Sequence, residues 1–166
     1  RIIKTKFLSL EQKDSLMQLW NNEYPAKLNL KTIEDFELYL NGLSKTKHYL
    51  LLDDSDEIQG WTFTFLREDE NWFAIILNSE IHAKGIGSLL MNEIKKNNTS
   101  LTGWVIDHEN EIKHNATFYK SPLQFYIKNY FIIFISSTSH FESANFSMMK
   151  RIYFVSTMMF LLKRGS

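Results

Sequence analysis

The sequence predicts one α/β (α+β) domain, with a central mixed, mostly antiparallel sheet of six to seven strands flanked by about four helices. Three observations lead to this fold class. Apolar residues recur at helical spacing near the N-terminus, short apolar runs separated by turn residues follow, and a glycine loop then joins an apolar run to a helix-like segment. A helix between two neighbouring strands implies a parallel crossover, whereas short turns imply antiparallel pairing.

Two amphipathic helices are expected in the first 43 residues. Ser9 is a candidate N-cap for a helix over 10–20, where Leu16, Leu19 and Trp20 supply an apolar face. A second helix is expected over 32–43, because acidic residues occupy its first turn, where the helix dipole favours them.

Three apolar runs then predict an antiparallel meander. The expected strands are 48–52, 58–66 and 72–77, and the segments between them are rich in acidic and other polar turn residues. The crossover comes next, with a helix over 89–96 and a strand over 101–106.

The C-terminal third predicts one more helix and a closing hairpin. Ser121-Pro122 is a typical helix start, and the helix is expected to reach about Lys128. Strands are expected over 131–135 and 146–153. The apolar tail, 152–162, is predicted to be a core strand or a docked terminal helix, because it is about half the ~20 residues that a membrane-spanning helix needs.

Composition limits the class of protein. The chain has 166 residues, of which 44% are hydrophobic, so it suffices for a single domain over 1–162, with 163–166 as a tail left outside it. The 19 basic residues balance the 19 acidic ones without a basic block, so neither nucleic acid nor a membrane surface is expected as partner. Cysteine is absent, which excludes disulfides and a cysteine nucleophile. With no secretory leader pattern, we expect a cytoplasmic protein.

The glycine loop is the strongest functional signal. The run Trp72 to Leu77 leads into His82-Ala83-Lys84-Gly85-Ile86-Gly87-Ser88 and then into a helix. Backbone N–H groups at such a helix start form a ring that suits a diphosphate. The sequence therefore predicts a phosphate-bearing cofactor. No histidine has metal-ligand spacing to another histidine or to an acidic residue, so no metal site is expected.

The element order and two joints resemble the GNAT superfamily of acyl-CoA-dependent N-acyltransferases. That family's loop reads Gln or Arg, two residues, Gly, any residue, then Gly or Ala, and here the register is His82-Ala83-Lys84-Gly85-Ile86-Gly87. The second joint, Phe125-Tyr126-Ile127-Lys128-Asn129-Tyr130-Phe131, looks like the family's Phe-Tyr-x-Lys-x-Gly-Phe helix. The resemblance covers about 48–131.

Three positions depart from the family pattern. His82 replaces Gln or Arg, Ala83 stands where Gly is frequent, and Tyr130 stands where a helix-ending Gly is common. Histidine can still donate a hydrogen bond to phosphate, so we expect the loop to work with weaker cofactor affinity. Because a bulky residue resists a positive φ, we expect Asn129 to make that turn in place of Tyr130.

The resemblance implies that acetyl-CoA is the acyl donor. It places the pantetheine arm along Leu77, Asn78 and Ser79, and the oxyanion donor near the Leu77 N–H. It places the diphosphate on the amides of 83–88, which are Ala83, Lys84, Gly85, Ile86, Gly87 and Ser88, with His82 beside them. It also implies that many relatives pair through their last strands, so a homodimer is expected.

Acetyl transfer to an amine requires a base and an acid. Tyr126 occupies the position that protonates the departing CoA thiolate in many relatives, and a phenol suits a thiol of similar basicity. Asp107 and His108 directly follow the strand 101–106 and are both expected to be catalytic, with His108 as the base and Glu80 and Glu23 as its rivals. The resemblance also implies that Glu23 and Tyr24 bind the acceptor, a small-molecule or peptide amine that the sequence leaves open.

Two other functions stay open at this point. A dinucleotide-binding oxidoreductase is suggested by Gly85-Ile86-Gly87 and by Asp107, which lies 20 residues after Gly87, but Leu90 stands where the third glycine belongs. A non-catalytic CoA-binding or regulatory domain is suggested by the departures at His82 and Ala83.

Overall fold

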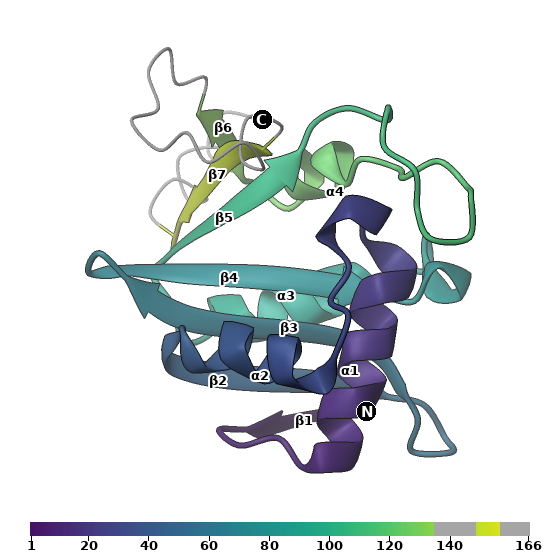
Figure 1. Ribbon diagram of the computed structural model, residues 1–166. Helices are drawn as coiled ribbons and strands as arrows, with labels where there is room; N and C mark the ends of the chain where they lie inside the picture. The colour runs from purple at the N-terminus through teal and green to yellow at the C-terminus, as the bar shows by residue number, and fades with distance from the viewer. Residues whose placement is uncertain (135–148, 157–166) are drawn as a thin grey trace.

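A seven-stranded sheet forms the centre of the computed structural model, which describes residues 1–134 and 149–156 (Figure 1). The strand order is β1-β2-β3-β4-β5-β7-β6, and every neighbouring pair is antiparallel except β4 with β5. The strands are β1 (Ile2–Thr5), β2 (Ser44–Leu52), β3 (Ile58–Arg67), β4 (Glu70–Leu77), β5 (Ser100–Ile106), β6 (Ile132–Phe134) and β7 (Met149–Val155). The predicted mixed, mostly antiparallel sheet is confirmed.

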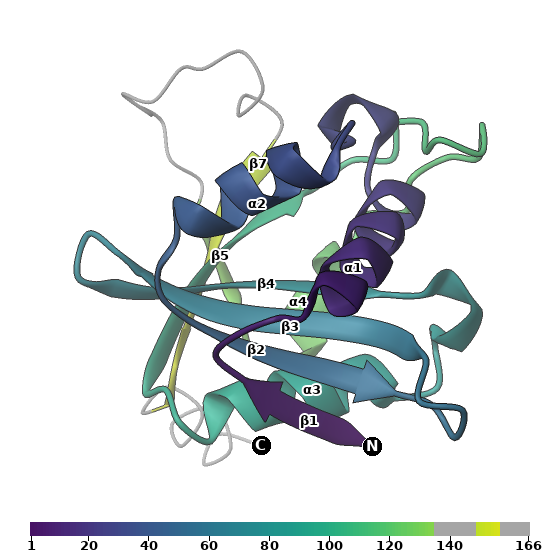
Figure 2. The same cartoon turned by 60° about the horizontal axis from the view of Figure 1, so that its bottom comes forward.

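Helices cover both faces of this sheet (Figure 2). α1 (Leu10–Glu23) and α2 (Ile33–Asn41) bury Leu16, Leu19 and Phe36 in a cluster with residues of β2, β3 and β4. α3 (Ile86–Lys95) and α4 (Leu123–Lys128) belong to a second cluster on the other face. Two short 3-10 helices are η1 (Ala26–Leu28) and η2 (Ser79–Ile81). No helix in the described ranges is long and apolar enough to cross a membrane.

The starts of α1 and α2 follow from local sequence. Ser9 accepts a hydrogen bond from the Gln12 N–H while the Gln12 side chain accepts one from the Ser9 N–H, and Thr32 and Asp35 repeat the arrangement. Each such capping box satisfies two N–H groups that lack partners within the helix. The predicted N-cap at Ser9 is therefore confirmed.

β4 and β5 are paired at a single register position and then separate. They pair only at Trp72 and Thr102 and then diverge toward their carboxyl ends (Figure 1). The Asn78 N–H bonds to the Gln59 carbonyl of the β3 side. Because hydrogen-bonding direction alternates along a strand, the polar backbone groups of Leu77 face the opening instead. We call the space between the strand ends at Leu77 and Ile106 the mouth.

The structure departs from the predicted elements at both ends of the sheet. β1 was not predicted, and β2 begins at Ser44, four residues earlier than expected. β6 ends at Phe134 and β7 begins at Met149, so the predicted strand positions at 135 and 146–148 lie outside the described residues. The tail is a buried strand at Ile152 and Phe154, while 157–162 lie outside the described residues.

The prediction that Asn129 makes the turn after α4 is wrong. Asn129 has φ −93° and Tyr130 takes φ +63°. The Tyr130 N–H bonds to the Ile127 carbonyl and the Phe131 N–H to the Tyr126 carbonyl, which is the Schellman pattern. Asn129 does not take the turn position itself, because its buried side chain is held by hydrogen bonds that it donates to the Phe125 carbonyl and to Ser88 Oγ.

Candidate active site

The glycine loop presents free amides at the start of α3. Gly85 is the N-cap with φ +77°, and Ala83 also has a positive φ of 60°. Within the described ranges, no hydrogen bond uses the N–H groups of 83–87, whereas those of Ser88 and Leu89 donate to the Gly85 carbonyl. Unpaired N–H groups at a helix start form an anion site. Lys84 is exposed on the same loop.

Gly87 lets this loop approach the end of β4. A Cβ at this position would lie 2.9 Å from Leu77 Cδ1 and 2.9 Å from Phe125 Cε2. A larger residue would force Leu77, Phe125 or α3 to shift, because such contacts are shorter than real packing allows. The glycine thus brings the loop, the strand end and α4 together.

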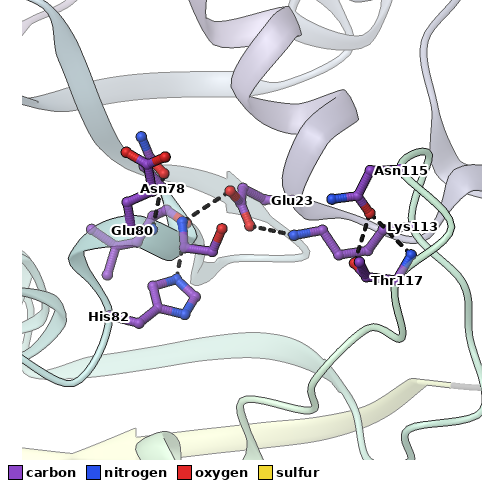
Figure 3. Close-up of polar contacts among 9 residues, drawn as sticks. Glu23, Asn78, Glu80, His82, Lys113, Asn115 and Thr117 are labelled. Carbon is purple, nitrogen blue, oxygen red and sulfur yellow. Dashed lines mark hydrogen bonds and ion pairs between the residues drawn. The ribbon is translucent and has the colours of Figure 1, made fainter.

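His82 does not point toward the loop amides. Its Nε2 lies 3.0 Å from the carbonyl oxygen of Leu77, so the imidazole covers one of the backbone groups that face the mouth (Figure 3). The other two residues expected beside pantetheine are engaged elsewhere. Asn78 caps η2 and donates from Nδ2 to Gln59, and the Ser79 N–H donates to Glu23.

α4 is tied at both ends, which fixes Tyr126 near the mouth. At its start, Ser121 Oγ donates to the carbonyl of Ile106, the last residue of β5, at 2.5 Å. At its end, Lys95 of α3 donates from Nζ to the Asn129 carbonyl at 2.5 Å. Burial lowers the pKa of Lys95 to about 8.

The Tyr126 side chain is 4% exposed and packs edge-on against Phe73 and Phe131, with ring centroids 6.0 Å and 5.6 Å away. Its hydroxyl makes no hydrogen bond within the part of the chain that the structure describes. Burial holds the pKa of Tyr126 well above its ordinary value, and the nearby Tyr24 and Tyr119 add to the rise. The phenol is therefore protonated at neutral pH.

Tyr24 and Tyr119 border the same region. Two isolated β-bridges bring their segments together: the Ala26 N–H bonds to the Ile112 carbonyl and the Tyr119 N–H to the Glu111 carbonyl, both at 2.8 Å. Burial raises the pKa of Tyr24 to about 12, and it also raises the pKa of Tyr119. Sequence reasoning missed Tyr119, because only its place in the loop before Tyr126 hints at a role.

Glu23 joins three segments at the mouth (Figure 3). Its Oε1 accepts from the Ser79 N–H at 2.9 Å, just after β4, and its Oε2 lies 2.8 Å from Lys113 Nζ on the loop after β5. Because both oxygens are occupied, Glu23 is poorly placed to accept a proton.

Asp107 and His108 follow β5, as expected, but they are not equivalent. Asp107 lies 2.5 Å from Lys150 Nζ, and this contact holds the pKa of Asp107 below its ordinary value. His108 Nδ1 accepts a long hydrogen bond of 3.3 Å from the Asn110 N–H. Because Asp107 is held by an ion pair, His108 is the less constrained of the two side chains. No three metal-binding side chains cluster in the described residues.

Comparison with known proteins identifies the fold. No family model and no curated protein matches the sequence. Aminoglycoside 6′-N-acetyltransferase, solved with coenzyme A, is similar at TM-score 0.64 and 17% identity over 92% of this chain and 94% of its own. Spermidine/spermine N-acetyltransferase from Vibrio cholerae reaches TM-score 0.62 and 16% identity over 100% of this chain and 98% of its own.

A GNAT-family acetyltransferase from Staphylococcus aureus is also similar, at TM-score 0.61 and 14% identity over 94% of this chain and 99% of its own. All three similarities extend over nearly the whole of both chains. The chain has the fold of the GNAT acetyltransferases.

Proposed function

We propose that the chain is an N-acetyltransferase that transfers an acetyl group from acetyl-CoA to a primary amine by direct attack in a ternary complex. The observation that carries the proposal is the separation of β4 from β5, which gathers the free loop amides, the Leu77 backbone and Tyr126 around one opening. The mostly antiparallel sheet is at odds with the oxidoreductase alternative, which needs a doubly wound parallel sheet.

The loop and strand end suit the acyl donor. The amides of 83–87 would hold the diphosphate at the start of α3, and the exposed Lys84 would add charge. The pantetheine arm would lie along β4, where the backbone of Leu77 faces the mouth. His82 must leave the Leu77 carbonyl if pantetheine is to bind that oxygen.

The transfer follows from these groups. The amine nitrogen bonds to the thioester carbonyl carbon, the Leu77 N–H stabilises the oxyanion, and the carbon–sulfur bond then breaks. Tyr126 gives its proton to the departing thiolate, and solvent later returns one. The weakly polar surroundings that raise the pKa of Tyr126 raise that of a thiol in the same place, so the transfer stays feasible.

We propose His108 as the group that removes the amine proton, through a water molecule. Glu23 and Asp107 are each bound to a lysine, whereas the one hydrogen bond that His108 makes within the described residues is long, at 3.3 Å. Replacement by Gln should lower kcat, because glutamine cannot take up a proton. An unchanged kcat would exclude this role.

Calorimetric titration with acetyl-CoA, with NAD as a parallel ligand, tests the proposed function directly. We expect micromolar acetyl-CoA binding and no response to NAD. Binding without transfer to any amine would favour the alternative of a non-catalytic CoA-binding domain, which the His82 contact with Leu77 would suit. Absence of acetyl-CoA binding would overturn the proposal.

Tyr126→Phe tests the assigned acid. The ring packing is retained while the proton donor is lost, so we expect kcat to fall by about 10²-fold with little change in the KM for acetyl-CoA. Tyr153→Phe is a matched control, because that tyrosine lies on β7 and packs against Phe134. Equal rates for wild type and Tyr126→Phe would disprove the role.

A further inference from the structure

The carboxylates that border the mouth are bound to lysines of the same chain. The pairs, with their nitrogen–oxygen distances, are Glu23 with Lys113 (2.8 Å), Glu111 with Lys27 (2.7 Å) and Asp107 with Lys150 (2.5 Å). Charges at this end of the two strands therefore cancel locally. An incoming cation would find each of these anions already neutralised.

The pair at Glu23 is the most deeply placed of the three. Its side chain is 12% exposed and that of Lys113 is 10% exposed, so water screens this pair less than the others. The Ser79 N–H fixes the second carboxylate oxygen. Lys113 thus occupies the Glu23 oxygen that the Ser79 N–H leaves open to a cation.

Three tyrosine hydroxyls also border the mouth. The hydroxyls of Tyr24, Tyr119 and Tyr126 stay protonated at neutral pH and can bond to an amine without adding negative charge. On the loop, Ile112 and Phe118 are 53% and 69% exposed and face each other across a β-bridge. They provide exposed apolar surface on the loop that also carries Lys113.

Two nearby carboxylates, of Glu80 and Glu109, have no ion pair within the described ranges. Both side chains are exposed to water, where attraction to an ammonium is weak. Neither is therefore a strong binding point for a cation held at the mouth.

We propose that Lys113 is a specificity-determining residue that restricts the acceptor to monoamines with an apolar or aromatic body and excludes polyamines. The inference rests on the proposed function. A second ammonium would meet the ammonium of Lys113 at the position where it needs an anion, and that repulsion would act against polyamines. Two similar structures are named for aminoglycosides and spermidine, which have several amino groups. This chain would differ from them in its choice of acceptor.

The test compares 2-phenylethylamine with spermidine as acceptors, with CoA thiol release as the readout. For the wild type we expect kcat/KM to be at least about ten-fold higher with 2-phenylethylamine. Lys113→Met frees Glu23 Oε2 while Ser79 still orients the carboxylate, so the preference should shift about ten-fold or more toward spermidine. The double variant Glu23→Gln/Lys113→Met should lose that shift again.

Lys13→Met is the matched control, because it breaks a lysine–glutamate pair with Glu37 near the other end of α1. It should leave the ratio unchanged. A wild-type preference for spermidine, or an unchanged ratio in Lys113→Met, would overturn the inference. If neither amine reacts, the affinities of the two amines for CoA-loaded protein are measured by calorimetry instead. The same preferences and the same shift in Lys113→Met are then expected for binding. Failure of acetyl-CoA itself to bind would instead overturn the proposed function, and with it this inference.

Discussion

Ala83 and Tyr130 are among the described non-glycine residues that adopt a left-handed backbone conformation, which their side chains resist. Ala83 and Tyr130 have φ values of 60° and 63°, and both stand where the resembling family commonly has glycine. In this region the Cβ approaches the neighbouring carbonyl oxygen, which costs about 1–2 kcal/mol for residues other than glycine. Surrounding contacts must offset this cost, and at Tyr130 they include the two Schellman hydrogen bonds.

Tyr130→Gly should therefore stabilise the protein. The ring is 44% exposed, so little packing is lost, and we expect a gain of about 1 kcal/mol in the free energy of unfolding. Urea unfolding measures it. Tyr130→Ala removes the same ring but keeps the Cβ, so it should show no comparable gain. Equal stability of the two variants would show that the conformation is not strained.

His48 links one side chain to the stability of the fold in acid. It lies buried on β2, where its Nδ1 accepts from Trp61 Nε1 at 3.2 Å, and burial lowers its pKa from 6.5 to about 4. Between these values the unfolded chain binds a proton that the folded chain does not, so stability falls as pH falls through this window.

The expected loss from His48 is about 3 kcal/mol between pH 6.5 and pH 4. Unfolding free energies of wild type and His48→Gln over this range measure it, because glutamine retains an acceptor for Trp61 but does not titrate. The carboxylates contribute equally to the pH dependence of stability in both proteins. Parallel curves would contradict the assigned pKa.

At the scale of elements, the site depends on how closely α3, α4 and β4 approach one another. Gly87 permits this approach, and the Ser121 and Lys95 hydrogen bonds hold α4 in place. None of these contacts involves neighbours in sequence. The geometry at Tyr126 is therefore a property of the packed helices and strand together.

Gly87→Ala tests this dependence. The new Cβ would lie 2.9 Å from side-chain atoms of Leu77 and Phe125, so we expect a loss of about 1–3 kcal/mol in stability and weaker acetyl-CoA binding. Thermal unfolding and calorimetry measure the two effects. Gly42→Ala is the control, because its Cβ would be 3.4 Å from the nearest atom, an ordinary contact. Equal effects of the two changes would refute the packing argument.

At the scale of the whole molecule, sequence reasoning succeeded where the signal is local. The Ser9 cap, the meander and the glycine loop each depend on neighbouring residues, and each is present. It failed where partners are distant. Glu23 meets Lys113 across 90 positions, and the four residues of β1 become a strand only because β2 lies beside them. Local sequence patterns do not indicate which distant residues will be in contact.

A pair of strands joined at a single point has a consequence for the molecule without ligand. Beyond Trp72, the backbone of β4 that faces β5 behaves like the edge of a sheet although it lies at the sheet's centre. Amide protons there should exchange with solvent deuterium far faster than those bonded to β3, even though all belong to one strand. Exchange rates that alternate along β4, with every second amide slowed when a ligand occupies the gap, would be the signature of this interior edge.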